Sequence, residues 1–510
     1  MLARTPLDST DVTVIAFDGA GSWSRPSEFR LHKFLLAARS PYFRRKLKAH
    51  ANRDAPGTAV RAVRLADSVD ARAFETAVKF MYLSEVFEPG RADHVLVGLE
   101  RLSRLLEMPQ LWGAVVVESE NQKKRRQQRT EAVEKAQDDL DRWFRESVLA
   151  KKICLGSVEE AQQVRVEQDN EFFADVLLMA EEDGDEDDGD GGDGGNGDHG
   201  GGCDGDDAEA IAKAKAKAEA ESKAKVVLYP VHKGMLRSEF FAAMFAGYFK
   251  EGRQLHQTEA LPIVPIDTSP AVLEHVLSFL YSERGDIPLE LALDCLMIAE
   301  QLLLDRLKHK CSHVISSAGQ NDNLPYPIYD VVRAGWLFGV RRLEEFGAKY
   351  IADRLERYLA DPELAELVAE SAQRIRERQE TDTIELVDDI RYYLAVRFKQ
   401  RIGEEDPLFE GGLGLDDEPP EPAELGRDDA FFDRRGRQQE ELLGQIDELL
   451  GELPCCPCRG AESRLSGSDC AGRKPEIGRI SKRLKGWLSE VCVPGFRSPL
   501  GWIAARASSM

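Results

Sequence analysis

Two stretches of the sequence decide the fold: DVTVIAF at residues 11–17 and FRLHKFLLAARSPYF at residues 29–43. The first is β-branched and apolar, which predicts a strand, and the start of the second can return beside it in a hairpin. Helical spacing of apolar residues follows over 33–47, with an interruption at Pro41. A further strand over 60–65 and helices around Phe74–Tyr82, over 91–107 and over 109–150 complete a mixed α+β unit.

The sequence repeats this arrangement. The second copy reads DVLLMAE at 175–181, YPVHKGMLRSEFFAAMF at 229–245, LPIVPID at 261–267 and AVLEHVLSFLYSE at 271–283. His32–Lys33 corresponds to His232–Lys233, and several short matches occur in the same order at nearly one offset. Such self-similarity indicates a duplicated structural unit.

Charge separates the two copies from the rest of the chain. The protein has 510 residues with 91 acidic and 68 basic side chains, a formal charge of −23 that argues against nucleic acid as the main partner. Residues 181–207 hold 13 acidic residues and 11 glycines, and such a stretch cannot bury apolar surface. We expect residues 181–225 to be a disordered insertion at the tip of the second hairpin.

The arrangement resembles the BTB/POZ domain: a strand beginning Asp-Val, a His-Lys pair opening a helix, a Ser-x-Phe-Phe-like turn, a strand, and a helix closing on Phe-x-Tyr. The resemblance implies an α+β fold, a small sheet flanked by helices, at residues 9–118 and again at 170–318, with a helical linker at 119–168. The helices predicted over 320–402 look like the BACK region that often follows BTB domains. Two BTB domains and a helical region together resemble the fungal ankyrin repeat and BTB/POZ domain-containing family, although no ankyrin repeat is recognisable before residue 11.

Beyond these helices we expect an acidic linker at 403–429, an amphipathic helix at 430–453 and a disordered Cys/Arg-rich tail at 454–510. The tail could bind zinc, but it lacks the second close cysteine pair of a structural finger, so a metal site is not expected. Its candidate zinc ligands are Cys455, Cys458, Cys470 and Cys492. The basic run Lys123–Arg129 could be a nuclear import signal or a phosphate-binding patch, although a solvated helix face is favoured.

No nucleophile motif, phosphate-binding loop or metalloprotease motif occurs, so we expect no catalytic residue and no cofactor. His32 and His232 could be proposed as bases, but a histidine at the head of a buried helix usually caps or packs. The sequence has no signal peptide and no apolar run long enough to span a bilayer. Its nine cysteines, five of them after residue 450, do not make a disulfide framework, so the protein is expected in the cytoplasm, the nucleus or both, without membrane partners.

The family resemblance also implies interaction sites. A hydrophobic-x-Glu element after the Phe-Phe turn is similar to the cullin contact of BTB adaptors, and the second copy offers Phe249, Lys250 and Glu251 there, whereas the first has no glutamate after Leu47. The alternative is that Phe249 is a core residue. The resemblance also implies a buried Asp–Arg/Lys pair in the dimer pocket, at positions that Asp11 and Arg30 occupy in the first copy. The second copy has Asp175 but Pro230 where the basic residue would be, so Asp175 must be held differently or exposed.

The resemblance therefore implies a non-enzymatic adaptor that recruits an unknown substrate to a cullin-3-type RING ubiquitin ligase. The alternative is a BTB scaffold that assembles proteins in the nucleus or cytoplasm without a cullin. BTB domains also commonly dimerise, so self-association is expected, either between chains or as an intramolecular pair formed by the two copies.

Overall fold

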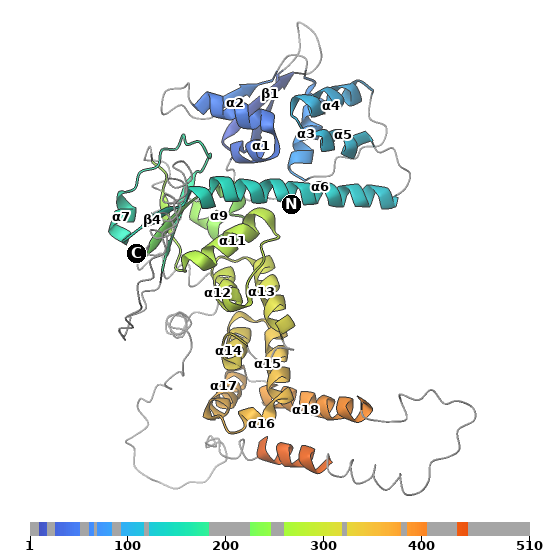
Figure 1. The fold of residues 1–510 in the computed structure, drawn as a ribbon, viewed down its shortest axis with the longest axis vertical. Coiled ribbons are helices and arrows are strands. Elements are labelled where there is room, and N and C mark those ends of the chain that lie inside the picture. Colours follow the sequence, from blue (N-terminus) through green and yellow to red (C-terminus); the bar gives the residue numbers. More distant parts are fainter. Residues whose placement is uncertain are drawn as a thin grey trace, which may run out of the picture. The chain divides into compact units, whose positions relative to one another are not determined.

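The computed structural model describes residues 10–17, 26–51, 61–65, 69–83, 93–116, 122–182, 225–245, 260–318, 324–378, 385–404 and 436–446. Their contacts divide the chain into two compact units, one formed by residues 1–287 and 297–307 and the other by residues 288–296 and 308–510. The first repeat, and the second repeat up to residue 283, belong to the first unit (Figure 1).

The first repeat has a three-stranded sheet in the order β2-β1-β3, formed by β1 (Val12–Phe17), β2 (Pro26–Leu31) and β3 (Arg61–Arg64). β1 is antiparallel to β2, with Val12 opposite Leu31, and parallel to β3. The valines and alanine that alternate along β1 are buried, as the period-2 pattern predicts. The helices of this repeat are α1 (Lys33–Arg39), α2 (Pro41–Ala51), α3 (Ala71–Met81), α4 (Asp93–Leu105) and α5 (Pro109–Val116).

The second repeat has the same three strands and one more. Its sheet order is β4-β6-β5-β7, in which β5 (Val176–Glu181) is antiparallel to β6 (Val226–Val231) and parallel to β7 (Ile263–Pro265). The helices that follow are α9 (Glu239–Ala243), α11 (Pro270–Ser282), α12 (Ala292–Gln301) and α13 (Asp305–Ser317). Strand order and direction of β6-β5-β7 thus reproduce those of β2-β1-β3, which confirms the predicted α+β duplication.

Local backbone geometry repeats as well. Ser40 Oγ accepts the N–H of Phe43 in the first repeat, and Ser238 Oγ accepts that of Phe241 in the second. A residue just beyond the end of each corresponding helix adopts the left-handed conformation: Leu83, two residues after α3, and Glu283, directly after α11. One element differs: α1 is replaced by the 3₁₀ helix η3 (Lys233–Met235), because the second repeat has two residues fewer between its His-Lys and Arg-Ser pairs.

The segment between the repeats departs from the predicted helical linker. Helix α6 (Gln122–Ser147) is followed by the short 3₁₀ helix η2 (Leu149–Lys151), and then β4 (Ile153–Leu155) joins the second sheet beside β6 before α7 (Val158–Gln163). The linker therefore supplies a strand to the second repeat. The single helix predicted over 109–150 is also wrong, since α5 ends at Val116 and α6 begins at Gln122.

The second unit is helical in its described residues. It contains the short 3₁₀ helix η5 (Leu289–Leu291) and the helices α14 (Ile328–Phe338), α15 (Arg341–Asp353), α16 (Leu355–Tyr358), α17 (Pro362–Arg378) and α18 (Glu385–Glu404). Helix α15 packs against α14 and α18, and Gly347 allows α15 to approach Val332 of α14. Buried Arg333 on α14 donates to Glu363 and Glu370 of α17, so polar contacts add to the apolar packing.

Several predicted features lie outside the described residues. They are most of the insertion 181–225, the segment Phe249–Glu251, the acidic linker 403–429 and the tail 454–510 with its cysteines. Of the amphipathic helix predicted at 430–453, residues 436–446 are described and helical, with Leu442 and Ile446 buried.

We predict that Gly347→Ala destabilises the second unit. A Cβ at this position would clash with Cγ2 of Val332, so the two helices must separate. Overpacking of this kind costs about 1–3 kcal/mol. Thermal unfolding followed by circular dichroism measures the effect. Gly444→Ala is the matched control, because its Cβ meets nothing within 4 Å in a helical segment and should stabilise by up to about 1 kcal/mol. Equal transition temperatures for the two variants would contradict the close helix contact.

Candidate protein-interaction site

The site begins at the histidine that follows β2 in the first repeat. His32 is buried, its backbone N–H donates to the hydroxyl of Tyr82 at 3.1 Å, and its Nδ1 lies 2.9 Å from the same hydroxyl. Because the hydroxyl oxygen accepts the N–H, its own proton can be donated to Nδ1 of a neutral imidazole. The tyrosine at the end of α3 is therefore held against the strand end, and the histidine packs rather than being presented to a substrate.

The second repeat builds the same pair. His232 is fully buried, its backbone N–H donates to Tyr281 at 3.1 Å, and its Nδ1 lies 2.5 Å from that hydroxyl. Its Nε2 lies 2.8 Å from the carbonyl oxygen of Phe172, to which it must donate. Burial lowers the pKa of His232 to about 4, so the ring is neutral with both nitrogens engaged. It has no lone pair left to act as a base.

Aspartates at the start of the first strand of each repeat hold the His-Lys turn. Asp11 Oδ1 accepts the backbone N–H of Lys33 at 2.7 Å, and Asp175 Oδ1 accepts that of Lys233 at 2.6 Å. Burial raises the pKa of Asp11 to about 6 and that of Asp175 to about 7. In each case the following lysine, Lys33 or Lys233, lowers the pKa, but burial has the larger effect. Asp175 is thus held by the turn in the same way as Asp11, so the expectation that the second copy holds its aspartate differently or exposes it is wrong.

The predicted buried pair of Asp11 and Arg30 does not form. Arg30 is exposed on β2, because residues of that strand alternate and Leu31 is the one that points into the core. The cation near Asp11 is Lys33, which contributes its backbone N–H and its charge. The prediction that Arg30 pairs with Asp11 is therefore wrong, and Lys33 is the basic residue beside this aspartate.

The two histidine–tyrosine pairs meet. The ring of Phe34 on α1 lies 4.6 Å from that of His232, centroid to centroid, and a Cβ on Gly234 would lie 2.9 Å from Cε1 of Phe34 and 3.0 Å from Cδ2 of His32. Charge on His32 also lowers the pKa of His232, and charge on Asp11 raises that of Asp175. The equivalent corners of the two repeats therefore face each other, and we call this contact the repeat interface.

Helix α6 covers the repeat interface and contacts both repeats. On one side it contacts α1, where Asp139 accepts a hydrogen bond from buried Arg39 at 2.8 Å. On the other it contacts α11, where the ring of Phe144 lies 5.1 Å from Tyr281. Trp143 between them is buried and its ring lies 6.2 Å from His232. The helix thus completes one continuous apolar interior shared by the two repeats.

The predicted cullin contact stands apart from this interface. The described chain stops at Phe245, after α9, so Phe249, Lys250 and Glu251 are not placed. In the first repeat Leu47 is buried on α2, which removes it as an exposed anchor. Sequence reasoning did not identify Tyr82 and Tyr281 as site residues, although both lie at nearly the same spacing after their histidines, 50 and 49 residues.

Within the described ranges no group of three or more histidine, cysteine, aspartate or glutamate side chains could hold a metal ion. No helix among these residues combines the length and the apolar character needed to cross a membrane.

We predict that Asp175→Asn becomes more stable relative to the original protein as the pH rises from about 5 to about 8. Because the pKa of Asp175 is raised, its protonated form stabilises the folded protein. This contribution is fully present below the ordinary carboxyl pKa of 3.8 and is lost as the pH rises through about 7. Asparagine keeps an oxygen for the Lys233 N–H but has no proton to lose, so the difference should change by about 1–3 kcal/mol. Urea unfolding at both pH values measures it. The lowered pKa of His232 changes stability with pH in the opposite direction, but this effect is common to both proteins. A stability difference between the two proteins that does not change with pH would refute the assignment.

Comparison with known proteins agrees with this geometry. Residues 4–122 and 224–318 match the BTB/POZ domain. A BTB/POZ domain-containing protein of Schizosaccharomyces pombe is 47% identical over 174 residues, which are 33% of this chain and 32% of that protein. An ankyrin repeat-containing protein of Saccharomyces cerevisiae is 42% identical over 181 residues, 34% of this chain and 35% of that protein. Armadillo BTB Arabidopsis protein 1 of Arabidopsis thaliana is 35% identical over 102 residues, 20% of this chain and 13% of that protein.

The matched region thus spans about a third of the length of each of the two fungal relatives. The second family match begins at residue 224, after the insertion, although β5 pairs with β6 and β7 in one sheet. The repeat interface consequently joins two modules of one kind. The chain carries two BTB/POZ domains, the second of them interrupted between its first two family strands.

Proposed function

We propose that this protein is an adaptor in which the two BTB/POZ domains pair within one chain and the second domain recruits a cullin-3-type RING ubiquitin ligase. BTB/POZ domains are protein-interaction modules, and the chain has two. The observation that carries the pairing is the contact of Phe34 with His232, because it brings the equivalent corners of both domains into one buried interior. Such a pair would replace the dimer that a single BTB domain forms with a second chain.

The cullin assignment is supported by the second domain's helix α9. Ser238 caps this helix and Phe241 is fully buried beneath it, so the chain is anchored in the domain a few residues before the segment that contains Phe249. That segment contains Phe249-Lys250-Glu251, a hydrophobic residue followed two positions later by a glutamate. An apolar anchor with a charged neighbour is the usual composition of an interface hot spot and its rim.

The substrate would be held elsewhere, near the ubiquitin-conjugating enzyme, so catalysis would depend on proximity and not on a residue of this chain. The helices of residues 320–402 are proposed as a BACK-like region that offers a further surface for a protein partner. The alternative function is a BTB scaffold without a cullin. The repeat interface favours assembly of this kind equally well, because pairing needs no ligase.

We predict that the repeat interface exists in solution and that Phe34 and Gly234 are energetically coupled. Gly234→Ala places a Cβ against the Phe34 ring and should cost about 1–3 kcal/mol, while Phe34→Leu should relieve part of that cost because it removes the ring edge. The free energies of unfolding of the two single variants and the double variant give a coupling energy, expected to exceed about 0.5 kcal/mol. Light scattering of the original protein should report a monomer. Additive effects, or a stable dimer, would contradict intramolecular pairing.

We predict that the full chain captures purified cullin and that Phe249→Ala with Glu251→Ala abolishes capture. The full chain is required because a fragment that begins at residue 170 would remove β4 from the second sheet. The matched control is Leu47→Ala with Lys48→Ala in the first domain; there Leu47 is buried, so the control should lose stability but keep cullin capture. Capture by the Phe249/Glu251 variant, or no capture by either protein, would leave the scaffold function in its place.

A further inference from the structure

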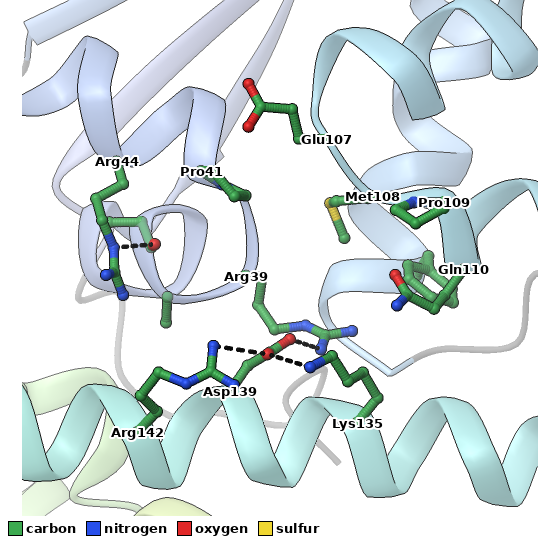
Figure 2. A pocket seen from close by; sticks show the side chains of 13 residues that line it. Arg39, Pro41, Arg44, Glu107, Met108, Pro109, Gln110, Lys135, Asp139 and Arg142 are labelled. Carbon is green, nitrogen blue, oxygen red and sulfur yellow. Dashed lines mark hydrogen bonds and ion pairs between the residues drawn. The ribbon is translucent and has the colours of Figure 1, made fainter.

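A pocket of about 250 Å³ lies between α1, the turn from α4 to α5, and α6 (Figure 2). It belongs to the first BTB/POZ domain and to the helix that follows it, and it uses neither the repeat interface nor the segment proposed to bind the cullin. Its interior is formed by buried Arg39, Phe80 and Met108, and its rim includes exposed Pro41 and Pro109. The pocket therefore combines a cation at its base with apolar walls.

The charges around the pocket do not balance. Asp139 on α6 receives three cations: Arg39 at 2.8 Å, Lys135 at 3.3 Å and Arg142 at 3.7 Å. The other carboxylate of the pocket, Glu107, forms an ion pair with Arg45, which lies outside it. Three cations thus share one carboxylate, and an additional anion would be attracted to them.

The hydrogen bonds of Arg39 also indicate that the pocket can take up an anion. Its side chain is 2% exposed, and its guanidinium donates to Asp139 through one terminal nitrogen. Its Nε is buried, and no hydrogen-bond partner reaches it from the described residues. A buried donor without an acceptor is costly, and the planar guanidinium can bind a second carboxylate.

Size and wall chemistry restrict the occupant. The volume is below that of pockets that enclose a drug-sized molecule, which start at about 300 Å³, so one side chain fits better than a cofactor. The guanidinium of Arg39 lies 5.6 Å from the ring centroid of Phe80, and Pro41 and Pro109 border the opening. The Phe80 ring and the two prolines would contact apolar atoms of a ligand, next to the ligand's negative charge.

We propose that this pocket binds the side-chain carboxylate of an acidic residue in a partner protein, in a segment where an apolar residue adjoins it. The carboxylate would be held by the cations of Lys135, Arg142 and Arg39, and the apolar neighbour would lie on the proline rim. The inference extends the adaptor function by giving the first domain a protein ligand of its own. It does not depend on cullin binding.

The test measures binding of two fluorescein-labelled peptide pools to the full chain by fluorescence anisotropy. One pool carries a central glutamate flanked by leucine, valine, proline or phenylalanine, and the other carries glutamine instead. The glutamate pool should bind about tenfold more tightly, because charge-assisted hydrogen bonds are lost with the amide. A benzophenone in the glutamate peptide should cross-link to residues 107–110 or 135–142.

The pocket variant is Lys135→Gln with Arg142→Gln, two partly exposed residues whose loss leaves the Arg39–Asp139 pair in place. The matched control is Arg126→Gln with Arg129→Gln, which removes the same charge from exposed positions of α6 outside the pocket. Binding lost only in the pocket variant supports the proposal. Equal affinity for the two pools, equal loss in both variants, or no binding of the glutamate pool at millimolar concentration would overturn it. The cullin test changes Phe249 and Glu251, which do not line the pocket, so either proposal can fail without the other.

Discussion

The N-terminal unit depends on the contact of Phe34 with His232. A histidine can be fully buried only if its ring nitrogens are satisfied, and Tyr281 and the carbonyl of Phe172 satisfy both. The neutral ring then offers a flat surface on which Phe34 packs. Gly234 is required beside it because a side chain at this position would meet Phe34 and His32. Each domain therefore completes the interior of the other, and the hydrogen bonds inside each domain are the condition for the packing between them.

Helix α6 makes this pairing specific. It carries Asp139 to the arginine of the first domain and Phe144 to the tyrosine of the second, so its two faces are matched to different partners. The same stretch of chain then supplies β4, which pairs with β6. The connection between the domains is thus part of the folded structure of both. Without this connection, the edge of the second sheet would lack β4 and the repeat interface would lack Trp143.

Much of this architecture follows from the sequence. Strand β1, helix α1 and the interruption at Pro41 could be predicted because period-2 and helical patterns are strong there. Arg30 was misassigned because family position was preferred to strand alternation, which places Leu31 inward and Arg30 outward. Strand β4 has three residues, too few for a pattern to show. The pairing of Tyr82 with His32 joins residues far apart in the chain, and only its recurrence in the second copy could have indicated it. Whether Phe249 is an anchor or a core residue stays a prediction.

The two copies have diverged where their arginines lie. Arg39 of the first domain turns to Asp139 on α6, while its counterpart Arg237 lies near Glu283 and Arg306 within the second domain. Arg39 lies at the end of α1, which has seven residues, and contacts α6. In the second copy η3 has only three residues, so Arg237 is placed differently relative to its sheet. A duplicated arginine thus lines a pocket in one domain and lies near charged residues of its own domain in the other. This asymmetry is what a two-domain chain can achieve and a symmetric dimer cannot: one copy can specialise in holding a protein ligand while the other keeps a different surface for assembly.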